Sequence, residues 1–292
     1  MTVETDLTGT TVSHYAVLER LGIGGMGVVY KARDTRLDRL VALKFLPTQL
    51  TGDAAAKQRF IDEAKTASAL DHPHVCTVYD IDETGEGHLF MAMAYVPGET
   101  LKARIARAPL SVPESLDIAL KVVAGLIEAH EHGIAHRDIK PANVLISREG
   151  NVKIVDFGLS TLVGLAAEGQ KGVIMGTLAY MSPEQTRNEP VDHRSDIWSL
   201  GITIWEMLVG RPPFGVLDEE PILYAIQSRV VPSLAELRPD VPKELARVVA
   251  RCLEKDRHRR YRTAVELEHE LRRCQRAVAE RSSSSGPSLP PE

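Results

Sequence analysis

Apolar and polar positions follow different patterns in the first third of the chain and in the remainder. Between residues 15 and 46, three short runs are rich in β-branched residues and alternate apolar with polar side chains: YAVLERLG, GVVYKARD and RLVALKFL. Glycine and the polar stretch TRLD separate these runs, so the pattern predicts an antiparallel meander of strands. Residues 53–70 place apolar side chains at helical spacing, which predicts an amphipathic helix. Strand-like runs then return before residue 94.

Helical spacing dominates after residue 99. The stretch VPESLDIALKVVAGLIEAHEHG has Pro113 and Glu114 at its start and Gly133 at its end, which are typical helix signals. Further helical patterns occur at 193–209, 218–229, 242–254 and 263–279. Strands come first, helices follow, and no internal repeat is present. The sequence therefore predicts an α+β fold of two lobes: a small antiparallel-sheet lobe with one main helix, and a larger, mostly helical lobe.

The same patterns predict where the lobes begin and end. We expect an N-terminal tail, a strand-rich lobe, a short connector, a helical lobe and a disordered Ser/Pro-rich tail at residues 1–13, 14–93, 94–98, 99–279 and 280–292, respectively. The most apolar stretch, 197–210, contains Glu206 and is shorter than the roughly 20 residues that a membrane span needs. No membrane span is expected within this chain.

Charge and cysteine content narrow the classes of function. The formal net charge of −5 gives no general attraction to nucleic acid or to anionic lipid, so we expect no nucleic-acid partner. Cys76, Cys252 and Cys274 are too few and too scattered for a disulfide framework or a zinc site. A reducing, cytoplasmic compartment is the simpler interpretation.

Three glycines near the N-terminus need an explanation, because glycine weakens strands. The stretch LGIGGMGVVYKARD contains Gly22, Gly24 and Gly27. A dinucleotide-binding unit needs such glycines to open a helix, but a strand pattern follows Gly27. A P-loop needs Gly-Lys-Ser/Thr, but Val28 and Val29 stand there. A flexible hairpin tip and a β-hairpin that folds over a nucleotide's phosphates are the interpretations left open.

Residues further along favour the phosphate-binding hairpin. The run VALK ends in Lys44, a compact charge that can reach phosphate oxygens. A carboxylate on the helix at 53–70 should hold this lysine, and Glu63 is preferred over Asp62. The run HRDIKPANVL follows, then DFG from Asp156, then SPE from Ser182. Each of these triplets is weak evidence alone, but their order and spacing together indicate a phosphoryl-transfer site.

On these motifs, the chain resembles the protein kinase family over residues 15 to about 275. GGMGVVYKARD, HRDIKPANVL and GTLAYMSPEQ make it most similar to the bacterial, eukaryotic-like (Hanks-type) serine/threonine kinases. The resemblance implies transfer of the γ-phosphate of ATP to Ser and Thr hydroxyls of protein substrates, with autophosphorylation left open. It implies ATP and Mg²⁺ as cofactors, with Mn²⁺ as an alternative ion. A homodimer is neither implied nor excluded.

The resemblance also implies roles for single residues. Lys44 would contact the α- and β-phosphates, with Glu63 as its partner. Asp156 would chelate Mg²⁺, and Asn143 would complete the second metal site through its amide oxygen. The adenine and phosphate contacts would come from the glycine hairpin, from the apolar walls and from the connector: Leu21, Gly22, Gly24, Gly27, Val29, Ala42, Lys44, Met93, Tyr95, Val96, Asn143, Leu145 and Asp156.

Phosphoryl transfer itself would involve the catalytic loop, which is the run HRDIKPANVL. Asp138 would accept or orient the proton of the substrate hydroxyl, and Lys140 would neutralise charge on the γ-phosphate. Thr177 would lie near both, which favours serine/threonine over tyrosine specificity. His136 and Phe157 are expected to be packing residues.

Four further positions are implied to support the helical lobe and its regulation. Asp196 would anchor the backbone of the catalytic loop, and Arg260 would pair with Glu184. Arg137 commonly receives a phosphate in related kinases, but residues 162–176 contain no Ser, Thr or Tyr. We therefore expect this segment to be ordered without phosphorylation.

Overall fold

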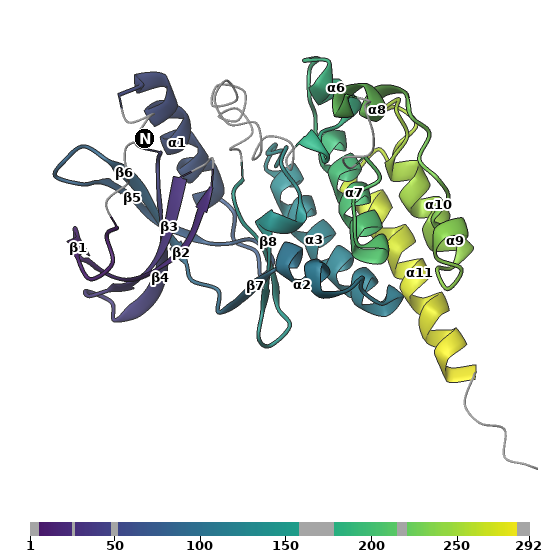
Figure 1. The fold of residues 1–292 in the computed structure, drawn as a ribbon, viewed down its shortest axis with the longest axis horizontal. Coiled ribbons are helices and arrows are strands. Elements are labelled where there is room, and N and C mark those ends of the chain that lie inside the picture. The colour runs from purple at the N-terminus through teal and green to yellow at the C-terminus, as the bar shows by residue number, and fades with distance from the viewer. Residues whose placement is uncertain (1–5, 25–26, 48–51, 158–177, 215–220, 285–292) are drawn as a thin grey trace, which may run out of the picture.

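The strand-rich lobe is built on one antiparallel sheet. The computed structural model describes residues 6–24, 27–47, 52–157, 178–214 and 221–284. The sheet has the strand order β1-β2-β3-β4-β6-β5 (Figure 1). Its strands are β1 Thr11–Val12, β2 Tyr15–Gly24, β3 Gly27–Asp34, β4 Arg39–Phe45, β5 Val78–Glu83 and β6 Leu89–Ala94. The predicted meander is confirmed, and β1 lies inside the stretch that the sequence assigns to the N-terminal tail.

Helix α1 (Ala54–Ser68) packs on this sheet. Asp53 caps its start, because its carboxylate accepts from the backbone N–H groups of Ala55 and Ala56 at 2.8 and 3.2 Å. Phe60 and Ala64, four positions apart and therefore on one helix face, are buried in a cluster with β6 residues such as Met91. The helix predicted at 53–70 is confirmed.

A second, three-stranded sheet follows the connector. It consists of β7 (Gly98–Thr100), β8 (Val144–Ser147) and β9 (Val152–Ile154) in that order. The 3₁₀ turn η2 (Pro141–Asn143) leads directly into β8, and Asp156 follows β9. The paired strands β8 and β9 therefore bring the turn that ends at Asn143 and the residue Asp156 to the same end of this small sheet.

Helices form the rest of the molecule around a central apolar helix (Figure 1). They are α2 Leu101–Arg107, α3 Val112–Glu131, α6 Pro183–Thr186, α7 Arg194–Val209, α8 Ile222–Ser228, α9 Leu234–Leu237, α10 Lys243–Cys252 and α11 Ala264–Ser284. Residues of α7 are buried almost throughout, and its buried polar side chains, Ser195, Ser199, Thr203 and Glu206, lie at helical spacing along one face. The longer helices match the predicted patterns, whereas short α2, α6 and α9 carry too few turns for a periodic signal.

The α+β fold with two lobes is confirmed (Figure 1). Helix α11 continues to Ser284, past residue 280 where the sequence places the start of the tail. Its last residues are serines, which the composition alone assigns to a solvated tail. Across the ranges that the structure describes, every helix is too short or too polar to span a bilayer.

Candidate active site

Lys44 and Asp156 form an ion pair between the strand-rich lobe and the loop after β9. Lys44 lies near the end of β4, opposite Met91 of β6, and its side chain is 3% exposed. Its Nζ lies 2.8 Å from Asp156 Oδ1. Asp156 has a φ of 66°, a left-handed conformation that is unusual outside glycine. A buried ammonium needs a partner, and here that partner is the carboxylate predicted to bind metal.

The predicted carboxylate partner on α1 is placed by its backbone only. Glu63 belongs to α1, and its side chain lies outside the described residues. Asp62, the alternative, is exposed, and its Oδ1 accepts from Gln58 Nε2 at 2.9 Å on the same helix. Asp62 thus contacts a neighbouring turn of its own helix.

Three side chains converge at the catalytic loop. Asp138 Oδ2 lies 2.7 Å from Lys140 Nζ and 3.0 Å from Asn143 Nδ2, and Asn143 Nδ2 also donates to the Asp138 carbonyl at 2.9 Å. All three residues are buried. The tight turn η2 brings Asn143 back over Asp138, so residues five positions apart meet at one carboxylate.

Asp196 holds the backbone of this loop from α7. Its Oδ2 accepts from His136 N at 2.8 Å, and its Oδ1 accepts from Arg137 N at 2.6 Å. His130 Nε2 lies 2.8 Å from Oδ2 as well. Because Asp196 is fully buried, these contacts satisfy a charge that would otherwise be costly. The predicted anchoring role is confirmed.

His136 links the catalytic loop to the strand before Asp156. Its Nδ1 accepts from Asp138 N at 3.2 Å, and its Nε2 lies 3.0 Å from the Val155 carbonyl. A carbonyl can only accept, so the network assigns the proton of this imidazole to Nε2. The ring also packs on Phe157 with centroids 4.5 Å apart. The packing roles predicted for His136 and Phe157 are confirmed.

The glycine hairpin has two kinds of glycine. In the register of β2 and β3, Gly22 faces Val29 and Gly24 faces Gly27. Gly27 has a φ of 112°, and a Cβ there would lie 1.8 Å from the Phe45 carbonyl oxygen. A Cβ on Gly22 would meet nothing within 4 Å. Gly27 is therefore required by the neighbouring strand itself, whereas Gly22 borders open space.

Apolar residues predicted to contact adenine lie on both sheets. Ala42 and Met93 are opposite each other in β4 and β6, and they share a cluster with Val29. Leu145 lies on β8 of the second sheet, opposite Thr100. Among the remaining predicted contacts, Leu21 is 45% exposed, while Tyr95 and Val96 are half-buried in the connector. Thr177 lies outside the described residues.

Arg260 and Glu184 form a bidentate, buried ion pair, as predicted. Arg260 Nη1 and Nη2 lie 2.7 and 2.8 Å from Glu184 Oε1 and Oε2, and Ser195 Oγ donates to Oε1 at 2.6 Å. Burial opposes ionisation of Glu184, but the hydrogen bonds and charge of Arg260 outweigh it, so the pKa of Glu184 is lowered to about 2.

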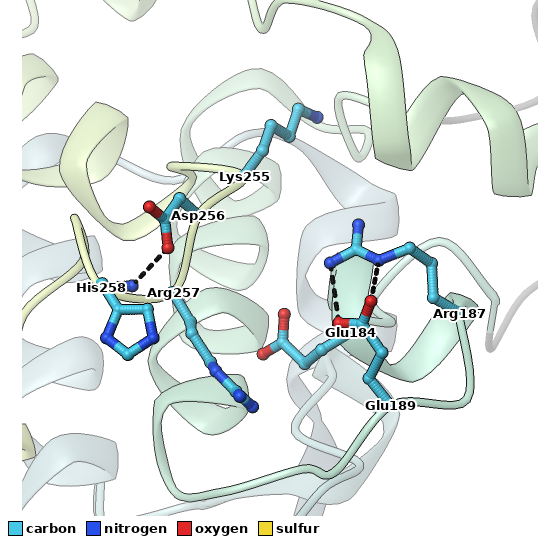
Figure 2. Close-up of a pocket in the computed structure, with 7 residues that line it drawn as sticks. All are labelled: Glu184, Arg187, Glu189, Lys255, Asp256, Arg257 and His258. Atoms are coloured by element: carbon cyan, nitrogen blue, oxygen red, sulfur yellow. Dashed lines mark hydrogen bonds and ion pairs between the residues drawn. The ribbon is translucent and has the colours of Figure 1, made fainter.

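A pocket of about 220 Å³ borders this ion pair. Figure 2 shows its charged lining, in which Arg187 pairs with Glu189. The other lining residues are Glu184, Lys255, Asp256, Arg257 and His258. None of these is a predicted nucleotide or transfer residue, so this pocket is separate from the site around Asp138.

The SPEQ motif forms a helix cap that was not predicted from the sequence. Ser182 Oγ accepts from Gln185 N, and Gln185 Oε1 accepts from Ser182 N, which is a capping box for α6. Gln185 Nε2 also donates to the Arg137 carbonyl at 2.8 Å. A serine followed three positions later by glutamine is the signal that could have revealed this cap.

Comparison with known proteins assigns this fold to a family. The family model described as the protein kinase domain matches residues 15–271. The chain belongs to the protein kinase family.

The curated relatives include bacterial serine/threonine-protein kinases. PrkC of Bacillus subtilis (strain 168) is 37% identical over 268 residues, which cover 91% of this chain and 41% of that protein. PknB of Mycolicibacterium smegmatis is 39% identical over 284 residues, covering 92% of this chain and 45% of that protein. The chain therefore spans less than half the length of these relatives. Their names confirm the resemblance to the bacterial, Hanks-type group.

Solved structures agree with the fold. The PknI kinase domain of Mycobacterium tuberculosis superposes with a TM-score of 0.74 at 30% sequence identity. The match covers 92% of this chain and 98% of that one. The two-lobed α+β architecture is thus that of a solved bacterial kinase domain.

Proposed function

We propose that this chain is an active serine/threonine kinase domain that transfers the γ-phosphate of ATP to Ser and Thr hydroxyls of proteins. One observation carries the proposal: the Lys44–Asp156 pair and the Asp138 cluster are joined through one strand end. Val155 N donates to the Asn143 carbonyl at 3.0 Å, and His136 Nε2 reaches the Val155 carbonyl. The predicted metal ligand and the predicted base therefore belong to one connected network.

Lys44 and Asp156 are assigned to the phosphate end of the nucleotide. Lys44 supplies the positive charge for the α- and β-phosphates. Glu63, on the adjacent helix, would pair with this lysine, and Asp156 would hold the metal ion. Gly22 and Gly24 carry no Cβ, so that the backbone amides at their positions can approach phosphate oxygens.

The donor set suits Mg²⁺. Asp156 contributes a carboxylate that is 19% exposed, and Asn143 uses its Nδ2 on Asp138, which leaves the amide oxygen as the donor for a metal. Mg²⁺ prefers oxygen ligands and is usually held by one or two protein side chains plus substrate phosphates. In the part of the chain that the structure describes, no cluster of three or more His, Cys, Asp or Glu side chains could hold a metal by itself. Bound Mg²⁺, or Mn²⁺ in its place, would neutralise phosphate charge.

Asp138 and Lys140 are assigned to the transfer step. Asp138 orients the acceptor hydroxyl and accepts its proton as the hydroxyl oxygen bonds to the γ-phosphorus, while the bond from that phosphorus to the bridging oxygen breaks and ADP leaves. Lys140, 2.7 Å from Asp138 Oδ2, stabilises negative charge on the transferred group. Thr177 is proposed to complete this arrangement and to favour Ser and Thr acceptors.

Adenine is proposed to bind between the two sheets. Val29 and Ala42 form one wall, and Leu145 forms the other. Met93 borders the pocket, and the backbone of Tyr95 and Val96 reads the adenine edge, with Leu21 covering the opening. The three cysteines are free and buried, which suits a reducing compartment such as the cytoplasm.

Incubation with Mg²⁺, labelled ATP and a generic protein substrate tests the proposal, followed by mapping of the labelled positions. We expect label on Ser and Thr, dependent on Mg²⁺ and lost in Asp138→Asn. A chain that binds ATP without transferring phosphate would instead be a nucleotide-binding pseudokinase. Label confined to tyrosine or to a small molecule would also contradict the proposal.

A further inference from the structure

We propose that Gln185 is a positioning residue for phosphoryl transfer, because its amide ties the start of α6 to the peptide group that carries Asp138. The inference rests on the proposed kinase function and adds a residue to it. Gln185 is not among the residues predicted to contact substrate or nucleotide. It acts through the backbone of the catalytic loop.

The backbone that Gln185 contacts is strained. Arg137 has a φ of 65°, a left-handed conformation that is unfavourable for a residue with a Cβ. Such a conformation persists only where its surroundings fix it. On the N-terminal side, Asp196 Oδ1 accepts from Arg137 N at 2.6 Å. On the C-terminal side, the carbonyl of Arg137 accepts from Gln185 Nε2 at 2.8 Å.

The peptide group between Arg137 and Asp138 is therefore held at both ends. Its carbonyl is bound by Gln185, and its N–H donates to His136 Nδ1 at 3.2 Å. The orientation of this plane sets where the Asp138 side chain leaves the backbone. Rotation of the plane would move the Asp138 carboxylate away from Lys140 and Asn143, and small displacements of a catalytic group are costly.

The oxygen atom of the Gln185 side-chain amide is also held by a hydrogen bond. Its Oε1 accepts from Ser182 N at 2.9 Å, within the capping box of α6. Ser182 is fully buried, and its hydroxyl donates to Ser195 Oγ at 3.0 Å, which in turn donates to Glu184 Oε1. Because a donor lies on one side of the amide and an acceptor on the other, only one amide orientation satisfies both. The chain of contacts thus joins the buried Glu184–Arg260 pair to the catalytic loop.

Comparing two substitutions distinguishes the hydrogen bond from Gln185 to the Arg137 carbonyl from the capping box of α6. Gln185→Glu keeps an oxygen for Ser182 N but replaces the donor with a second acceptor facing the Arg137 carbonyl. Gln185→Met, of similar size, loses both contacts. Thr186→Val is the matched control, because it removes hydrogen bonds to Pro183 and Gln227 from the same short helix without touching the catalytic loop.

Steady-state kinetics on a peptide substrate is the first measurement. We expect kcat to fall about tenfold in both Gln185 variants, the change produced by about 1.4 kcal/mol of lost transition-state stabilisation. The KM for ATP should stay the same, and Thr186→Val should keep kcat within about twofold of the wild type. A wild-type kcat in Gln185→Glu, or an equal loss in Thr186→Val, would overturn the proposal.

Hydrogen exchange of the Asp138 amide is the second measurement, and it does not require activity. We expect this amide to exchange faster in Gln185→Glu than in the wild type, while amides in the middle of α3 stay protected. Unchanged exchange at Asp138 would overturn the positioning role even if the enzyme is active. A wild-type chain without phosphate transfer would refute the proposed function, and the exchange result would still decide the role of Gln185.

Discussion

Two buried ion pairs in this molecule have the same formal charges and opposite surroundings. Glu184 and Arg260, between α6 and the loop before α11, are both almost fully buried. Lys44 and Asp156 bridge the two lobes, and the Asp156 side chain is 19% exposed. The first pair is closed on every side, whereas the second is open to a ligand.

The hydrogen bonds explain this difference. Arg260 uses all its donor nitrogens: Nε binds the Glu254 carbonyl at 2.8 Å, and Nη1 and Nη2 bind Glu184 and the carbonyls of Arg194 and Lys255. For Lys44, one ion-pair partner at 2.8 Å is described. An ammonium with three donors and a partly exposed carboxylate can both exchange partners. We propose that the closed pair stabilises the helical lobe and that the open pair is the one that phosphate and metal would contact.

The largest expected effect belongs to the open region. Asp138→Asn should lower turnover about 10²- to 10⁴-fold, or ~3–5.5 kcal/mol, because the side chain acts on the acceptor hydroxyl. ATP affinity should hardly change. Single-turnover kinetics with saturating ATP measures the rate, and near-normal turnover would remove Asp138 from its assigned role.

Breaking the closed pair should affect stability instead. Glu184→Ala leaves Arg260 buried without its counter-ion, and such losses cost about 3–5 kcal/mol of unfolding free energy. Glu114→Ala is the control, since it removes a bidentate pair with Arg104 at 2.9–3.0 Å in a half-exposed position. That control should lose about 1 kcal/mol or less. Urea unfolding compares the two, and equal losses would contradict the distinction between closed and exposed pairs.

Low pH should reduce the free energy of unfolding by protonating Glu184 of the closed pair. The pKa of Glu184 is about 2 in the folded chain, against 4.5 for an ordinary glutamate. The lowered folded-state pKa means that its contribution is fully present above pH 4.5 and is lost as the pH falls towards 2. The loss amounts to roughly 3 kcal/mol from the shift in pKa. Unfolding free energies across this range should fall less steeply in Glu184→Gln, and parallel curves would refute the assignment.

Much of this organisation could be predicted from the sequence. The meander and the long helices carry several repeats of their apolar period, and the motif order identifies Lys44, Asp138 and Asp156 before any coordinates are known. The anchoring role of Asp196 and the Arg260–Glu184 pair also follow from the resemblance.

Other features depend on tertiary contacts that no local pattern encodes. Gly27 is needed because the Phe45 carbonyl lies against it, not because of its place in the glycine pattern. The link from Gln185 to Arg137 joins residues 48 positions apart through one amide. The left-handed φ of Arg137 could not be predicted from the residue type, because Arg does not favour that conformation.

The smallest expected effect concerns the segment at 162–176, which lies outside the described residues. Because it offers no Ser, Thr or Tyr, exhaustive phosphatase treatment should leave specific activity unchanged. Ser160→Ala and Thr161→Ala should likewise retain activity. If dephosphorylation abolishes activity and it returns with modification of Ser160, Thr161 or Thr177, the hypothesis of order without phosphorylation is wrong.

The central claim is that the open ion pair of Lys44 and Asp156 is the metal and phosphate site. Calorimetry of ATP binding with and without Mg²⁺, on the wild type and on Asp156→Asn, tests it most directly. Glu114→Gln, in the exposed pair with Arg104, is the control. The account predicts that Mg²⁺ strengthens ATP binding in the wild type and in the control, and that Asp156→Asn loses this gain. Equal Mg²⁺-dependent affinity in Asp156→Asn and the wild type would contradict the claim that the open ion pair is the metal and phosphate site.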